Sequence, residues 1–180
     1  DDLNEVNMRS TVALIATLAL ATPAVAADWN KPHINKGVLS KYKAKPPKVD
    51  LTEKDVEKLK AGKPVYKTIE AKSGGRGVAV FYVDATPDKV WKTIGNYPQY
   101  KNYIGEVKDI KVYEVAGNHH KVWFKVSSWG VKIEYFIDHI HNDKEKWTTW
   151  HLDYDKESDL GDSVGFWQLT PIDGGKRTQV

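Results

Sequence analysis

Apolar and polar residues alternate along most of the chain from Gly77 onward. A period of two is typical of β-strands, and brief clusters of Gly, Asn and Asp separate the alternating segments. Because these breaks have turn chemistry, consecutive strands should be antiparallel neighbours. The pattern predicts strands at residues 77–85, 107–115, 121–128, 131–140, 147–154, 163–170 and 176–180.

The middle strands have one apolar side and one largely polar side. In the third predicted strand Val122, Phe124 and Val126 share one side, and Lys125 and Ser127 share the other. The next two strands alternate in the same way. This pattern predicts an antiparallel sheet that is covered on one face and wet on the other.

Two short helical segments lie between the first and second strands. Thr86 is a suitable N-cap, and Pro87 suits the first helical position. Apolar residues then recur at helical spacing in two groups: Val90, Trp91 and Ile94, and, after Tyr97-Pro98, Tyr100, Tyr103 and Ile104. A hairpin would need no such insertion. We therefore expect these helices to supply part of the cover of the apolar face.

The N-terminal residues 1–27 have the features of a secretory signal peptide. Arg9 precedes the apolar run Thr11–Ala21, which is too short to span a membrane, and small residues follow it. The sequence predicts cleavage after Ala26 or Ala27 and a periplasmic or secreted protein. The residues before Met8 look like translated upstream sequence.

Residues 28–74 form a Lys- and Pro-rich segment with one short helix. Thr52 and Asp55 are spaced as a capping box, and Gly62 ends the helix. The part before the helix has a composition that buries little, so we expect a solvated, extended arm. A transient contact of its lysines with an anionic membrane surface is an alternative. Residues 75–180 form the predicted main domain.

The composition excludes several kinds of chemistry. The chain has no Cys, so it has no disulfide, thiolate metal site or thiol nucleophile. A formal net charge of +3 accompanies no nucleic-acid-binding motif, so we expect no nucleic-acid partner. The sequence also lacks a nucleophile elbow, a metalloprotease helix and a phosphate loop. We therefore predict no catalytic residue, metal site or cofactor.

Two groups of polar residues invite a metal interpretation. His139 and His141 lie on the same side of one strand, and His151 on the next strand is a conceivable third ligand. Histidines at strand ends or on a solvent face are the commoner case. The acidic residues of 153–159 have a spacing similar to that of a calcium loop, but the turn Gly and the final Glu are absent. An acidic hairpin loop is the preferred interpretation.

The order of these elements resembles the START-like (SRPBCC) superfamily, which includes polyketide cyclase/dehydrase proteins. The matching segments are residues 83–91 (VDATPDKVW), 96–100 (NYPQY) and 165–171 (GFWQLTP). The resemblance implies an α+β helix-grip fold, in which a curved antiparallel sheet of about seven strands, with two short helices after the first strand, encloses an apolar cavity. It also implies a closing C-terminal helix. That helix is missing from this chain, which we interpret as incomplete at its C-terminus.

The resemblance implies an exported carrier of a hydrophobic small molecule, such as a lipid, a sterol or hopanoid-like molecule, a quinone or a polyketide. The alternative is a polyketide cyclase/dehydrase-type enzyme that uses the same cavity. The residues expected to bind the ligand are Tyr100, Tyr103, Phe124, Val126, Ile133, Tyr135, Ile137, Trp150, Leu152, Tyr154 and Trp167. Periodicity alone does not separate a cavity lining from plain core, because both need apolar side chains.

Overall fold

The computed structural model describes residues 26–42, 44–71, 74–128 and 130–180. The predicted signal peptide therefore lies almost entirely outside the described residues. The helices are α1 (Glu53–Lys60), α2 (Pro87–Gly95) and α3 (Tyr100–Tyr103), with short 3-10 turns η2 (Tyr97–Gln99) and η3 (Asp173–Gly175). The strands are β1 (Val65–Ala71), β2 (Gly74–Val80), β3 (Tyr82–Val83), β4 (Val107–Ala116), β5 (His119–Ser128), β6 (Val131–Asn142), β7 (Trp147–Leu152), β8 (Val164–Gln168), β9 (Thr170–Ile172) and β10 (Arg177–Gln179).

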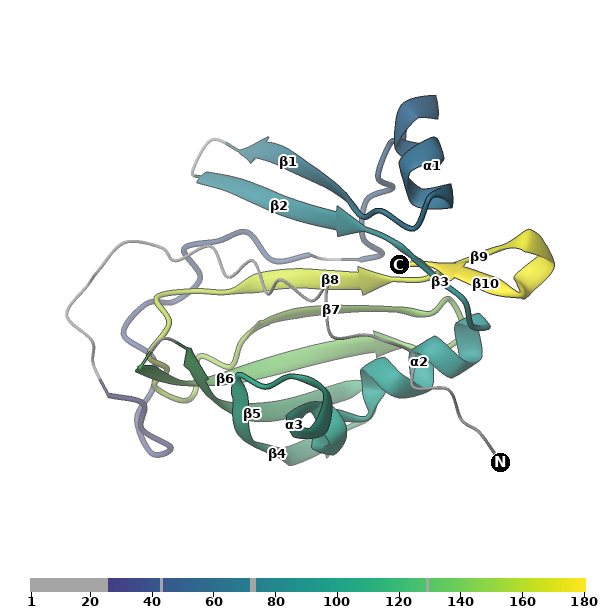
Figure 1. Ribbon diagram of the computed structural model, residues 1–180. Helices are drawn as coiled ribbons and strands as arrows, with labels where there is room; N and C mark the ends of the chain where they lie inside the picture. Colours follow the sequence, from purple (N-terminus) through teal and green to yellow (C-terminus); the bar gives the residue numbers. More distant parts are fainter. Residues whose placement is uncertain (1–25, 43, 72–73, 129) are drawn as a thin grey trace, which may run out of the picture.

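Strands β4 to β8 form an antiparallel meander in chain order (Figure 1). This confirms the strand pairing predicted from the short turns. Strand β8 runs through Leu169 into β9, which pairs with β10, and β10 pairs with β3. The chain is continuous from one sheet to the other at Leu169. There the Leu169 amide donates to the carbonyl of Lys146 at 2.9 Å, which holds the junction beside the start of β7. Two register shifts interrupt the pairing of β4 with β5, and such shifts bend an edge strand.

The first predicted strand, 77–85, differs from the structure. Its residues are divided between β2 and β3, and β2 pairs with β1, a strand that was not predicted. Residues 65–71 (VYKTIEA) do contain the strand-favouring types Val65, Tyr66, Thr68 and Ile69. The Lys and Pro content of the preceding segment obscured this signal.

The helix signals in the sequence are confirmed. Thr52 and Asp55 form a complete capping box at the start of α1. Thr86 caps α2 by accepting from the amide of Lys89, and Pro87 is the first helical residue. Helix α2 buries Val90 and Trp91 against Leu169, so it packs where the two sheets join. In Figure 1, α2 extends from the end of β3 toward α3, and α3 lies beside β4.

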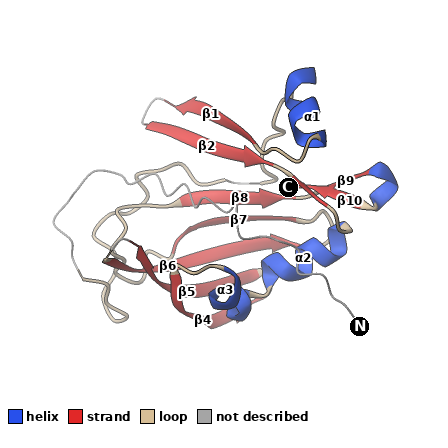
Figure 2. Cartoon of the chain, viewed as in Figure 1, coloured by secondary structure: helices blue, strands red, loops and turns tan. Residues whose placement is uncertain are grey.

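The two faces of the meander are covered by different parts of the chain. We call the face with Val122, Phe124, Ile137 and Leu152 the inner face; its core cluster includes Tyr97 of η2. We call the opposite face, which carries Phe136, the outer face. Figure 2 shows that the segment before α1, which we call the arm (residues 26–50), is drawn almost entirely as loop.

The arm packs on the outer face through a few residues, so this face is not simply wet; most other described residues of the arm are exposed, as a solvated arm implies. The Trp29 ring lies 4.7 Å from Phe136 and 5.7 Å from Trp123, measured between ring centroids. Phe136 is 0% exposed, and His33 of the arm is 3% exposed. The arm contacts the few aromatic residues of an otherwise polar face. The sequence pattern did not reveal these contacts, because the two partners of each are far apart in the chain.

The end of the arm joins a second, smaller core. Val49 and Leu51 pack with buried residues of α1, β1 and β2, namely Leu59, Val65, Val78 and Val80. Phe166 of β8 and Tyr82 of β3 also contact this cluster. The β1–β2 hairpin is thereby tied to the main sheet. Within the described part of the chain, no helix is long and apolar enough to cross a membrane.

Candidate functional site on the inner face

The inner face brings together nine of the eleven predicted ligand-binding residues. Direct cross-strand pairs join Val126 to Ile133, Phe124 to Tyr135, and Ile137 to both Val122 and Leu152. The nine are Tyr100, Phe124, Val126, Ile133, Tyr135, Ile137, Trp150, Leu152 and Trp167. Alternation along β5 and β6 places them on one side, as the period-two pattern predicts.

These residues differ in how deeply they lie. Phe124, Ile137 and Leu152 are buried and form the floor of the inner face. Tyr135, Trp150 and Trp167 are only partly buried, although α2, η2 and α3 lie on this side of the sheet. The Phe124 and Tyr135 rings stack with centroids 5.1 Å apart, and the Trp150 and Trp167 centroids are 6.3 Å apart. The result is an aromatic platform that the described helices do not fully cover.

Gly165 determines how the Trp150 ring lies on this platform. The two residues are direct partners on β7 and β8. A Cβ atom built on Gly165 would lie 2.1 Å from the Trp150 ring, well inside van der Waals contact. Only a residue without a side chain therefore lets the indole lie flat across β8.

Two predicted ligand-binding residues differ from the other nine: Tyr103 lies outside the inner-face cluster, whereas Tyr154 packs at its edge and also contacts the arm. The Tyr103 side chain is among the exposed large apolar groups, at 51% exposure. The Tyr154 ring stacks on His33 of the arm, and its hydroxyl donates to Asp162 at 2.8 Å. Tyr154 follows the end of β7, so strand alternation no longer determines its direction.

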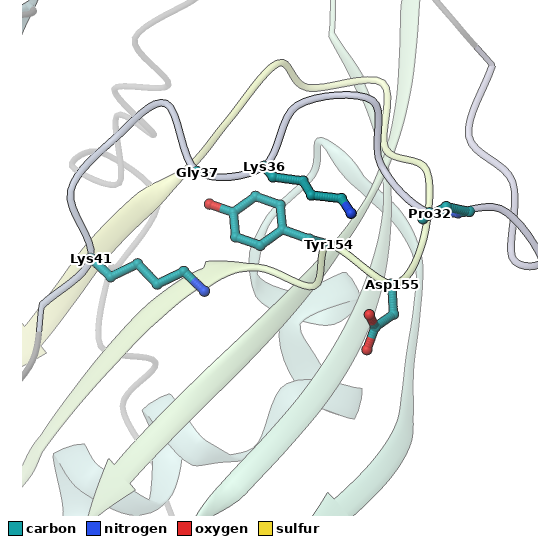
Figure 3. Close-up of a pocket in the computed structure, with 6 residues that line it drawn as sticks. All are labelled: Pro32, Lys36, Gly37, Lys41, Tyr154 and Asp155. Atoms are coloured by element: carbon teal, nitrogen blue, oxygen red, sulfur yellow. The ribbon is translucent and has the colours of Figure 1, made fainter.

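Tyr154 lines a pocket of about 330 Å³ between the arm and the loop after β7. Figure 3 shows its ring beside Lys36, Gly37 and Lys41 of the arm, with Asp155 nearby. The Lys41 ammonium lies 4.6 Å from the ring centroid. The charged lining does not match the apolar cavity expected from the sequence, and ten of the eleven predicted residues are not part of it.

A histidine cluster on the inner face was missed by the sequence interpretation. His120 and His139 are direct cross-strand partners, and the His120 and His141 rings lie 4.4 Å apart between centroids. His141 Nε2 is 2.7 Å from the Tyr97 hydroxyl. The spacing of His139 and His141 placed them on one side of a strand. Their burial at 7% exposure contradicts the preferred solvent-face interpretation.

The cluster does not have the arrangement of a metal site. His151, the third ligand considered from the sequence, lies on the opposite face, where its Nε2 is 3.8 Å from Asp138 Oδ2. Across the residues that the structure describes, no group of three His, Cys, Asp or Glu side chains is placed to hold a metal ion.

Burial keeps two histidines of the cluster neutral. Desolvation, with a smaller contribution from the neighbouring His141, lowers the pKa of His139 to about 3. Desolvation and the nearby His120 lower the pKa of His141 to about 4. His139 Nδ1 is buried and has no hydrogen-bond partner among the described residues. A buried polar atom of this kind costs about 1–3 kcal/mol unless a ligand or water pairs with it.

The tyrosines beside the cluster are held as phenols. Burial raises the pKa of Tyr135 to about 12. Burial also raises the pKa values of Tyr97 and Tyr100. The Tyr100 hydroxyl donates to the carbonyl of Ile94 at 2.5 Å, which ties α3 to the end of α2. The inner face therefore combines apolar rings with uncharged polar atoms, and carries no buried charge among its described histidines and tyrosines.

The acidic loop (residues 153–162) uses its carboxylates inside the protein. Asp153 accepts from the Tyr113 hydroxyl at 2.7 Å, and Glu157 contacts His33 Nδ1 at 2.7 Å. Asp159 accepts from the amide of Ala27 at 2.9 Å. These contacts agree with the interpretation of the segment as a structural loop, and they explain its acid content better than calcium binding does.

Comparisons with known proteins agree with this architecture. The protein TTHA0849 from Thermus thermophilus has a TM-score of 0.50 at 20% identity, with 56% of this chain and 66% of that chain covered. The Zhui aromatase/cyclase from a Streptomyces species has a TM-score of 0.50 at 16% identity, with 65% and 62% covered. A START superfamily protein from Mycobacterium smegmatis gives 0.48 at 13% identity, with 64% and 70% covered. No protein-family model and no curated protein sequence matches significantly.

The chain therefore has a START-like (SRPBCC) α+β fold with a large antiparallel sheet, as the sequence resemblance implied. It spans slightly less than two thirds of the first two structures. Identities of 20% or less support the shared fold alone. The ligand and the activity must be argued from the residues of this chain.

Proposed function

We propose that this protein binds and carries a hydrophobic small molecule on its inner face. The observation that carries the proposal is the aromatic platform, which stays partly exposed after α2, η2 and α3 have packed. An exposed apolar surface of this kind is typical of a binding site. Each Å² of apolar surface removed from water stabilises the complex by about 25 cal/mol.

The histidine cluster gives the ligand a preferred orientation. His139 Nδ1 lies beside the apolar floor, within a group of rings that includes Tyr97, Phe124 and Trp150. A neutral imidazole nitrogen pairs with a hydroxyl or an amide, and it gains nothing from a pure hydrocarbon. This favours a lipid, sterol-like molecule, quinone or polyketide with one polar group over an alkane.

We also propose that the protein is exported. The basic residue, apolar run and small-residue cleavage site of residues 1–27 support a periplasmic or secreted location. A carrier in that compartment would move its ligand between an aqueous space and a membrane. Exposed lysines of the arm, such as Lys36 and Lys48, are available for a transient contact with an anionic surface.

A ligand-retention experiment tests the carrier. The chain with its leader is expressed in an exporting bacterial host, purified and extracted with organic solvent, and the extract is examined by mass spectrometry. We expect a hydrophobic molecule in near-stoichiometric amount. Val126→Asp places a charge on the inner face and should reduce retention at least tenfold. Ser127→Asp, one residue away on the outer side of β5, is the matched control and should retain the ligand.

The outcomes separate the proposals. Equal retention by Val126→Asp and Ser127→Asp would contradict binding on the inner face. A folded wild-type protein without ligand would contradict the carrier proposal.

The membrane contact of the arm is measured by sedimentation with vesicles of phosphatidylcholine, with and without phosphatidylserine. Equal binding to vesicles with and without the anionic lipid would contradict an electrostatic contact of the arm.

A second candidate function is an enzyme of the cyclase/dehydrase type in the same site. The pair formed by the Tyr97 hydroxyl and His141 Nε2 favours it, because a neutral imidazole beside a phenol can exchange a proton with a bound carbonyl compound. Turnover of a poly-β-keto substrate that falls at least a hundredfold in Tyr97→Phe, with ligand retention intact, would support the enzyme. Unchanged turnover in that variant would contradict this role for the pair.

A further inference from the structure

The acidic loop holds the first described residues of the arm by their backbone. The Ala27 amide donates to Asp159 Oδ1 at 2.9 Å, and the contact is partly buried. The other oxygen, Oδ2, accepts from the amide of Glu134 in β6 at 2.6 Å. Next to this contact, Asp28 and Glu157 exchange two backbone hydrogen bonds of 3.0 Å. Asp159 therefore joins the start of the arm to the central sheet.

The contact lies at the predicted leader cleavage site. Two adjacent peptide bonds are candidates: Ala24-Val25-Ala26 precedes one, with a small residue at its first and last positions, and Val25-Ala26-Ala27 precedes the other, with the larger Val25 at its first position. The sequence leaves this choice open. The structure separates the two sites, because Ala26 is exposed and makes no such contact, whereas the Ala27 nitrogen is bound to Asp159.

We propose that the chain is cut between Ala26 and Ala27, and that the new α-ammonium group of Ala27 binds the Asp159 carboxylate. This inference rests on the proposed export. A leader peptidase and one water hydrolyse the bond: the water oxygen goes to the Ala26 carbonyl carbon, and the Ala27 nitrogen leaves as an amine that is protonated. The Asp159 carboxylate accepts from this nitrogen before and after the cut.

The cut changes the character of the Ala27 contact. In the uncut chain the donor is a neutral amide, and in the cut chain it is a cation. A hydrogen bond to a carboxylate is already stronger than one between neutral groups, and the ammonium adds a direct Coulomb attraction between opposite charges. Cleavage after Ala27 would instead remove the donor and leave Asp159 Oδ1 without this partner. Processing after Ala26 thus strengthens the attachment of the arm to the outer face.

The mass of the exported protein is the first test. The chain with its leader is produced in an exporting host, and its intact mass is measured after purification from the periplasm or medium. We expect the mass of a chain that begins at Ala27. A chain that begins at Asp28 would overturn this inference and leave the export proposal standing. An uncut chain that stays inside the cell would count against export itself.

A thermal-unfolding cycle is the second test. Asp159→Asn is introduced into the chain that begins at Ala27, and into the same chain with Gly-Ser before Ala27, where the donor is again a neutral amide. The loss of the Asp159–Glu134 contact is common to both backgrounds and cancels. We expect the Tm loss to be larger by about 2–4 °C in the chain with the free Ala27 ammonium.

Asp155→Asn is the matched control. Its carboxylate lies on the same loop, but the side chain is 88% exposed and it makes no contact with Ala27 among the described interactions. This substitution should lower the Tm equally, and little, in both backgrounds. Equal Tm losses for Asp159→Asn in the two backgrounds would overturn the proposed ammonium contact, whatever the cleavage site proves to be.

Discussion

The inner and outer faces of the meander differ in the way their polar atoms are paired. On the outer face, buried polar groups have partners from the arm and the acidic loop: both ring nitrogens of His33 face acceptors, namely Glu157 Oε1 at 2.7 Å and the Gly161 carbonyl at 3.0 Å. On the inner face, His139 Nδ1 is buried without a partner among the described residues, and large aromatic rings stay partly exposed.

This difference between the two faces suggests different roles: the outer face holds the fold together, and the inner face is the proposed binding site. The more polar face is closed by the chain itself, since buried polar groups are stable only when paired. The more apolar face keeps an unpaired polar atom and uncovered rings, which is the cost expected at a binding site. The sequence analysis expected a wet outer face and an apolar cavity on the inner one.

Breaking the pairing on the outer face should have the largest effect. Glu157→Ala leaves His33 with one acceptor fewer in a site where both side chains are at most 3% exposed. Leaving a buried hydrogen-bonding group without its partner destabilises a protein by about 1–3 kcal/mol, and Glu157 is also the acceptor of the Ile34 amide. We expect a loss of this size in chemical denaturation. Asp155→Ala, on the same loop at 88% exposure, should cost less than about 0.5 kcal/mol. Similar losses for the two would contradict a closed outer face.

Acid should weaken the inner face through its histidines. The pKa values of His139 and His141 fall from an ordinary 6.5 to about 3 and about 4 on folding. Below pH 6.5 the unfolded chain therefore binds more protons than the folded chain, and stability falls as the pH decreases. Between pH 6.5 and its folded pKa, each histidine lowers the unfolding free energy by about 1.4 kcal/mol for every pH unit of acidification. At pH 5 the loss is about 2 kcal/mol for each histidine.

Substitution isolates this contribution from other acid effects. In His139→Phe the slope of the unfolding free energy between pH 6.5 and 4 should decrease by about 1.4 kcal/mol per pH unit. If His139→Phe keeps the wild-type slope, His139 is not buried in its neutral form.

Gly165→Ala tests the geometry of the aromatic platform. The new methyl group would overlap the Trp150 ring, so the indole must move or the strands must separate. Overpacking of this kind costs about 1–3 kcal/mol. It should also shift the Trp fluorescence and weaken ligand retention. Gly161→Ala is the control, because its nearest contact would be an ordinary 3.8 Å from Asn35 Nδ2. Unchanged fluorescence and stability in Gly165→Ala would contradict the stacked geometry.

The features that were predicted correctly depend on local sequence. Period-two alternation, turn residues and the caps at Thr52 and Thr86 each act over a few neighbouring positions, and they indicated the meander, its inner face and the helices. The START-like resemblance rested on the same segments.

The features that were missed depend on pairing between distant positions. The burial of His33 requires Glu157, which is 124 residues away in the chain. The histidine cluster depends on the register that pairs His120 with His139, and periodicity within one strand does not contain this information. The direction of Tyr154 changes where β7 ends, a boundary that sequence patterns locate only to within a few residues.

The smallest effect should come from the exposed charges of the arm. Lys45 contacts Glu145 at 2.9 Å, but the two side chains are 54% and 47% exposed. Solvent screens such a pair, so Lys45→Ala should barely change the unfolding free energy, and about 0.5 M salt should remove even this difference. Urea denaturation at low and high salt measures the change in unfolding free energy and its salt dependence, because urea carries no charge. A salt-dependent loss as large as that in Glu157→Ala would mean that surface charge, rather than the buried contacts of Trp29 and His33, keeps the arm on the outer face.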